Sequence, residues 1–127
     1  MPEPVNLFDL AARQAQWLAA RQAAVAGNIA NANTPGYVAK DVQPFAEVLD
    51  GPRKAAPVNL SATAAGHWSP ARIRLEEETP KAAVLPSGNT VAMEDELVKA
   101  GEVRRAFELN TAVVKAFHRM LLMSVKG

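Results

Sequence analysis

The sequence predicts a mainly α-helical protein, with long N- and C-terminal helices packed as a coiled-coil-like pair and an irregular or β-hairpin-like central segment. Apolar residues near both ends recur at alternating spacings of three and four, the pattern of a coiled-coil seam. Between Pro35 and Gly88 lie seven of the nine prolines, so long helices cannot form there. The length of 127 residues suits a single domain.

The first segment, residues 1–34, is predicted to be a helix from about Val5 to Asn33, followed by a turn. Its seam consists of Phe8, Ala11, Ala15, Leu18, Gln22, Val25, Ile29 and Ala32. A separate stripe of small side chains consists of Ala12, Ala19, Ala23, Ala26 and Ala30. A helix that is apolar on several sides is buried on several sides, and one partner helix cannot cover them all. This segment is therefore expected to contact more than one neighbour.

The central segment, residues 35–89, is expected to be extended or partly disordered. Residues 71–75 alternate between apolar and basic side chains, which favours a short strand. A hairpin or small extended excursion between the helices is the structure that this pattern predicts.

The last segment, residues 90–127, is predicted to be a helix from about Val91 to Lys126, with Asn89 or Thr90 as its N-cap. Its seam consists of Ala100, Val103, Phe107, Asn110, Val114, Phe117, Leu121 and Ser124, and Leu109, Val113, Ala116, Met120 and Met123 widen it into a broad apolar face. The polar seam residues Asn110 and Gln22 are expected to set the register of the pair.

Composition argues against several classes of function. A formal net charge of +1 is too small for a nucleic-acid binder that depends on phosphate contacts. Cysteine is absent, and neither His67 nor His118 has a second ligand at metal-binding spacing. The acidic run Glu76 to Glu78 is interpreted as a solvated charge patch. No apolar run approaches the roughly 20 residues of a membrane span. We therefore expect no catalytic, cofactor or metal site, no nucleic-acid partner and no direct membrane insertion.

The most informative residues form the end of the first helix. These signature residues are Gly27, Asn28, Asn31, Asn33, Thr34, Pro35, Gly36 and Tyr37. Pro35 keeps the residue before it out of the helical region, and Pro35-Gly36 suits a turn with glycine at positive φ. The asparagine amides can bond carbonyl groups that the ending helix leaves unpaired. Three asparagines are more than a helix end requires, and their density suggests backbone held close to a neighbouring chain.

The signature resembles that of the bacterial flagellar axial proteins, the rod and hook group. The stretches 7–10, 13–18, 21–22, 102–107 and 109–120 are most similar to the proximal-rod member of that group. The resemblance implies a structural subunit whose terminal helices pair and stack into a tube. It implies export through the flagellar type III apparatus without a cleaved signal peptide, and a place in the periplasmic rod of the basal body. The implied partners are copies of itself, other rod proteins, the basal-body adaptor at the membrane ring and the export gate.

Related export substrates carry a Phe-x-x-x-apolar motif after the signature, and Phe45 and Leu49 match it here. Two alternatives remain open at this point. The chain is another flagellar axial protein, or it is a helical adaptor or binding module outside the flagellum. A small hydrolase or deaminase is disfavoured, because no set of residues resembles a catalytic site.

Overall fold

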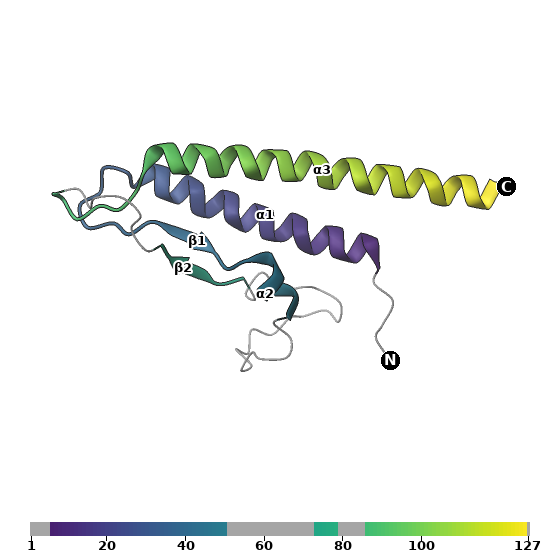
Figure 1. Cartoon of the computed structure of the whole chain (residues 1–127), viewed down its shortest axis with the longest axis horizontal. Coiled ribbons are helices and arrows are strands. Elements are labelled where there is room, and N and C mark those ends of the chain that lie inside the picture. Colours follow the sequence, from purple (N-terminus) through teal and green to yellow (C-terminus); the bar gives the residue numbers. More distant parts are fainter. Residues whose placement is uncertain (1–5, 51–72, 79–85, 127) are drawn as a thin grey trace.

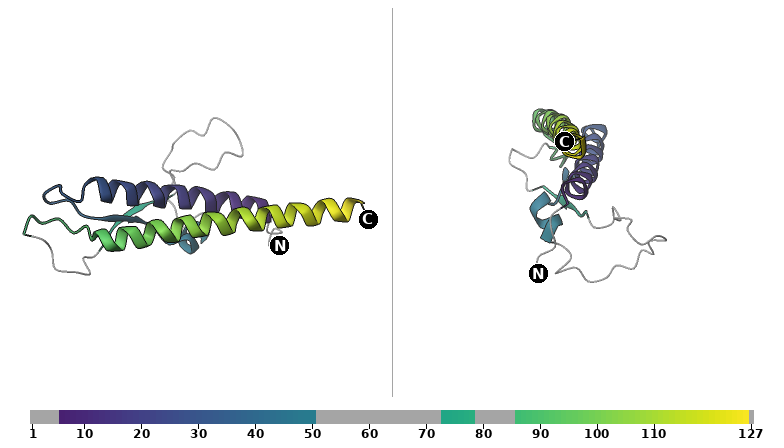
Figure 2. Two further views of the ribbon diagram at one scale, coloured as in Figure 1. Left: turned by 90° about the horizontal axis from the view of Figure 1, so that it is seen from above. Right: turned by 90° about the vertical axis from the view of Figure 1, so that its right-hand side faces the viewer.

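The computed structural model describes residues 6–50, 73–78 and 86–126, which form three layers. Helix α1 (Leu7–Ala30) is the middle layer. Helix α3 (Met93–Lys126) lies along one side of it, and on the other side lie strand β1 (Lys40–Val42), the short helix α2 (Phe45–Asp50) and strand β2 (Leu75–Glu77) (Figures 1 and 2). The predicted pair of long terminal helices is therefore confirmed.

Helix α1 begins at an asparagine cap. The side-chain oxygen of Asn6 accepts hydrogen bonds from the backbone N–H groups of Phe8, at 3.0 Å, and Asp9, at 3.4 Å. These bonds satisfy donors that have no partner within the first turn. The apolar side of α1 is buried at Leu18 and Val25, whereas Gln22 is exposed. The prediction that Gln22 sets the register is therefore wrong. A straight helix drifts by about 20° per heptad away from a strict seven-residue seam, and the contact passes to neighbouring positions.

The central segment forms the predicted small sheet. Strands β1 and β2 are antiparallel, and Lys40, Asp41 and Val42 lie opposite Glu77, Glu76 and Leu75. The described strand β2 begins at Leu75, and residues 71 and 72 of the predicted strand lie outside the residues that the structure describes. Strand β1 and helix α2 each contribute one buried apolar side chain to the interior, Val42 and Val48.

Helix α3 runs antiparallel to α1 and extends beyond the start of α1 (Figure 1). Its first turn carries Glu94, Asp95 and Glu96, which complement the helix dipole. The prediction that Asn89 or Thr90 caps this helix is wrong. The first helical bond joins the N–H of Glu96 to the carbonyl of Ala92, at 3.1 Å. The hydroxyl of Thr90 instead accepts a hydrogen bond from the N–H of Ala39 at 2.9 Å, and the side chain of Asn89 binds at the end of α1.

Candidate assembly site

The signature residues form a closed turn at the end of α1. The side chain of Asn31 donates to the carbonyl of Gly27 at 2.8 Å, and Thr34 Oγ1 donates to Asn31 Oδ1 at 3.1 Å. The N–H of Tyr37 donates to the carbonyl of Thr34 at 3.2 Å, and Gly36 has φ of 75°. The predicted positive φ at Gly36 is therefore confirmed, and the turn reverses the chain at that residue. Asn33 and Pro35 are exposed.

Asn28 joins α1 to the central segment rather than capping its own helix. Its side chain is fully buried, donates to the carbonyl of Lys40 at 2.7 Å and accepts from the N–H of Lys40 at 3.0 Å. The hydroxyl of Tyr37 donates to the same Asn28 oxygen at 3.4 Å. The amide of Asn28 thus pairs with both backbone groups of one residue, as a neighbouring strand would. The expectation that Asn28 bonds carbonyls at the helix end is wrong for this residue.

Asn89 adds a second cap to the end of α1, from outside that helix. Its Nδ2 lies 2.9, 3.0 and 2.8 Å from the carbonyl oxygens of Asn31, Ala32 and Thr34, and its Oδ1 accepts from the N–H of Val91 at 2.8 Å. Sequence reasoning missed this role. An asparagine just before a helix has the pattern of a cap for that helix, and nothing in the local sequence points to carbonyls more than fifty residues earlier.

The backbone crosses closely beside this cap. The N–H of Gly36 donates to the carbonyl of Ser87 at 2.9 Å, and the N–H of Thr90 donates to the carbonyl of Tyr37 at 3.1 Å. A Cβ on Gly88 would lie 3.5 Å from the Cα of Gly36. We call the two segments 31–39 and 87–91 together the clasp. The clasp fixes the start of α3 against the end of α1.

Arg21 connects three elements at the middle of the molecule. From α1, it donates to both carboxylate oxygens of Asp41 in β1, at 3.3 and 3.4 Å, and to Glu102 in α3, at 3.1 Å. Its guanidinium group also lies 5.8 Å from the centre of the Trp17 ring. Arg21 and Trp17 belong to the stretches that carry the family resemblance, and neither acidic partner of Arg21 was identified from the sequence.

The candidate export residues lie on α2. The Trp17 indole donates to the carbonyl of Gln43 at 2.7 Å, and its ring centre lies 5.7 Å from that of Phe45. Phe45 is thus part of the contact that holds α2 on α1. Leu49, near the end of α2, is exposed.

The two long helices meet along a seam with a polar residue in its middle. Val103 is buried, and Phe8 and Phe117 form an edge-to-face pair with ring centres 5.2 Å apart. Asn110 donates to the carbonyl of Ala11 and to the side-chain oxygen of Gln14, both at 3.0 Å. Asn110 thus bonds to a single turn of α1, which fits the predicted role of Asn110 in setting the register of the two helices. Other predicted seam residues are partly buried, namely Ile29, Phe107 and Val114, and Leu121 is more exposed.

Lys99 links α3 to the end of β2. It donates to the carboxylates of Glu78 and Glu96, and Glu96 is almost completely buried. Burial lowers the pKa of Lys99, but the hydrogen bonds and negative charges of Glu78 and Glu96 outweigh burial and leave the pKa above its usual value. The acidic run is therefore not only a solvated patch, because Glu78 belongs to this cluster.

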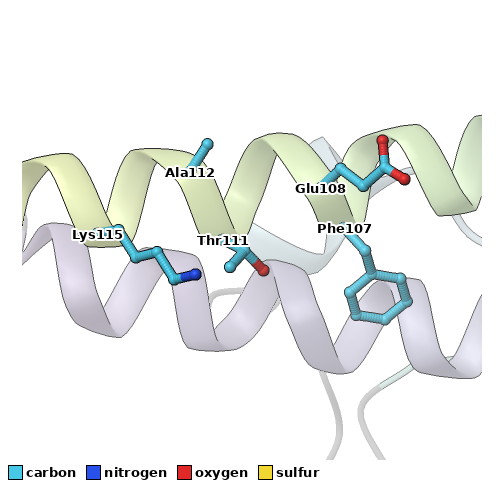
Figure 3. A pocket seen from close by; sticks show the side chains of 5 residues that line it. All are labelled: Phe107, Glu108, Thr111, Ala112 and Lys115. Carbon is cyan, nitrogen blue, oxygen red and sulfur yellow. The ribbon is translucent and has the colours of Figure 1, made fainter.

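The surface of α3 away from α1 remains uncovered. Leu109, Val113, Met120 and Met123 are 65%, 41%, 64% and 67% exposed. On another flank of α3, five residues line an open hollow of about 410 Å³. They are Phe107, Glu108, Thr111, Ala112 and Lys115, and the hollow is shallow rather than enclosed (Figure 3). Four of them have the spacing i, i+3, i+4, i+7 of a hole that accepts a side chain from another helix.

Among residues 6–50, 73–78 and 86–126, no group of three or more metal-binding side chains comes together. No helix in these ranges is long and apolar enough to pass through a bilayer.

Comparison with known proteins identifies a family and a relative. Residues 10–37 match the family described as flagella basal body rod protein, and this range includes most of α1 and the whole signature turn. Along nearly its full length the chain is similar to the flagellar basal body rod protein FlgB of Agrobacterium fabrum (strain C58). The two are 42% identical over 130 residues, which cover 98% of this chain and 96% of the relative.

Proposed function

Because the chain belongs to the flagellar basal body rod protein family, we propose that it is a subunit of the proximal rod that self-assembles through its terminal helices after type III export. The observation that carries this proposal is the 42% identity to a basal body rod protein along 98% of the chain. The family is one of structural flagellar rod proteins and not of enzymes.

The exposed faces of the helix pair support assembly through helices. An apolar patch that is uncovered in the single chain is a typical docking surface for another protein. We infer that the partners are further copies of this chain, other rod proteins, the basal-body adaptor at the membrane ring and, before assembly, the export gate. The proposed location is the periplasmic rod of the basal body, reached without cleavage of a signal peptide.

Deletion of the gene in the flagellated source strain tests the structural role. We expect the strain to lose swimming and to yield basal bodies without rods. A plasmid copy of the chain should restore both and should be found by mass spectrometry in the purified basal bodies. Complete rods in the deletion strain would contradict the proposed function.

A second experiment tests the export residues separately from assembly. We propose that the export gate reads Phe45 and Leu49 in the unfolded chain. In a strain that cannot build the rod, Phe45→Ala with Leu49→Ala should keep the chain in the cytoplasmic fraction. Val48→Ala is the matched control, because Val48 is the buried residue of the same helix and lies outside the motif. Equal secretion of all three chains would exclude the motif and leave the structural role untouched.

A further inference from the structure

Two uncovered stripes of the helix pair have matching spacing and opposite side-chain size. The α3 outer stripe consists of Leu109, Val113, Ala116, Met120 and Met123. The α1 outer stripe consists of Ala12, Gln16, Ala19, Ala23, Ala26 and Ala30. We propose that the α3 outer stripe of one subunit packs on the α1 outer stripe of a second copy of this chain. This inference rests on the proposed function and specifies which surfaces meet.

The spacing of the α3 outer stripe indicates that its partner is a helix. Its residues follow one another at intervals of four, three, four and three, which is the spacing of a coiled-coil seam. The seam that already packs on α1 in the same chain, through Val103, Phe107, Asn110, Val114 and Phe117, has equivalent spacing. Helix α3 therefore carries two seams, of which one is occupied by α1 and one is uncovered.

The α1 outer stripe has the complementary character. All six of its residues are exposed, and their intervals are four, three, four, three and four. No member of either stripe is charged. Alanine side chains leave room for leucine, valine and methionine side chains from a facing helix, whereas two stripes of large residues would hold the helices further apart. The size difference favours α1 of a second copy over α3 of a second copy.

The two seams of α3 merge where α3 extends beyond α1. Leu121 continues the occupied seam and is 43% exposed, while Met120 and Met123 on either side of it belong to the outer stripe. Figure 1 shows this part of α3 continuing past the first residues of α1. The uncovered stripe is thus continuous with a surface that already binds a helix of the α1 type.

The proposed contact joins different surfaces of identical chains, so it is heterologous and can continue from subunit to subunit as an open array. It is also small. The α3 outer stripe spans 15 residues, or about 21 Å of helix, and two such stripes cover much less than the roughly 800 Å² per partner of a standard interface. One contact alone is therefore weak, and repetition along the assembled rod stabilises it.

Disulfide trapping in basal bodies tests the contact. Because the natural sequence has no cysteine, any disulfide formed by this chain involves an introduced cysteine. Chains with Val113→Cys are co-expressed with chains that carry cysteine at Ala12, Ala19 or Ala26, three positions one heptad apart that allow for different registers. After mild oxidation, at least one pair should give about tenfold more disulfide dimer than the matched control, because a disulfide requires Cα atoms within about 7 Å. The control is Arg104→Cys, a position on α3 outside the stripe whose side chain is 84% exposed.

Two results would overturn the proposal while leaving the rod function intact. Dimers formed by Val113→Cys chains alone would show that α3 meets α3. Absence of dimers in all three pairs, in strains that swim, would show that another protein covers the stripe. If a chain with an introduced cysteine fails to assemble, the variant Ala26→Leu tests the contact instead. We expect that variant to unfold at the same denaturant concentration as the Ala26→Ser chain but to abolish swimming, and normal swimming would refute the contact. Absence of the natural chain from basal bodies would instead refute the proposed function.

Discussion

Asn28 and Asn89 each replace a backbone partner with a side chain. An asparagine amide has both donors and an acceptor, so it can satisfy an N–H and a carbonyl together. Asn28 does so for Lys40, and Asn89 does so for the end of α1 and for Val91. Both amides are nearly inaccessible to solvent, at 0% and 2% exposure, so water cannot take over their bonds. Asn28 thus holds the first residue of β1 against α1, and Asn89 holds the irregular backbone that follows α1.

Replacement of Asn28 by leucine should destabilise the isolated chain strongly. Leucine has a similar volume but leaves the N–H and the carbonyl of Lys40 unpaired, at a cost of about 1–3 kcal/mol for each buried group. Asn33→Leu is the control, because Asn33 is exposed and its replacement should change stability by less than about 0.5 kcal/mol. Urea denaturation followed by circular dichroism measures both. Equal midpoints would mean that the buried bonds of Asn28 contribute nothing.

Gly36 allows a test of backbone conformation without steric interference. Its φ is 75°, and a Cβ placed there would meet nothing within 4 Å. Gly36→Val should therefore cost about 1–3 kcal/mol through strain alone, and Gly36→Asn should cost less because asparagine tolerates positive φ. The free energy of unfolding of the two variants gives the comparison, and we expect the yield of rods in purified basal bodies to follow the same order. If valine and asparagine behave alike, positive φ at this residue is not what the turn requires.

Among the elements, α1, β1 and α3 are joined by one side chain, Arg21. Asp41 is 22% exposed and binds Arg21 through both oxygens, whereas Glu102 is 53% exposed and binds through one. Double-mutant cycles should give a coupling of about 1–2 kcal/mol for Arg21→Met with Asp41→Asn. The cycle with Glu102→Gln should give less than about 0.5 kcal/mol, because solvent screens the more exposed pair. A larger coupling to Glu102 would show that the contact to α3 is the stronger of the two.

The long helices were predictable from the sequence because each carries several repeats of an apolar pattern. No single residue decides such a pattern, so its period survives local exceptions such as Gln22. The boundaries were less predictable. Ala32 and Val91 continue the apolar patterns of the two helices, but α1 ends at Ala30 and α3 begins at Met93, because the clasp holds the backbone between them in turns and in bonds between its two segments.

The turn at Gly36 was also predictable, since proline and glycine restrict the backbone locally. The partners of Asn28, Asn89 and Arg21 were not, because each lies on an element that only the tertiary fold brings near. The cluster of Lys99 with Glu78 was hidden for the same reason. A run of three acids has the appearance of a solvated patch until a partly buried lysine from α3 is placed against its last member.

For the molecule as a whole, Lys99 makes stability depend on pH in the alkaline range. The pKa of Lys99 is raised in the folded chain, so the folded state holds this proton more tightly than the unfolded state does. Its contribution to stability is fully present below the usual lysine pKa of 10.5 and is lost as the pH rises through the folded value.

The Lys99→Met variant should therefore be less stable than the natural chain at pH 8. Between pH 8 and pH 11 its stability should fall by less than that of the natural chain. Urea midpoints measured across this range test the difference. Lys115→Met is the control, since Lys115 is exposed on the same helix and should leave the pH profile unchanged. Parallel profiles for the natural chain and Lys99→Met would show that Lys99 has the same proton affinity in both states.

The position of Asn89 has a consequence for how the chain matures. Asn89, which caps the end of α1, lies more than two thirds of the way along the sequence. Helix α3, which Arg21 and Phe8 of α1 contact, follows Asn89. A truncated chain that ends before Asn89 contains every signature residue but cannot close the clasp or cover the inner side of α1. We expect such fragments to be substrates for proteolysis rather than defective building blocks. The surfaces proposed for assembly therefore form only on chains whose translation has been completed.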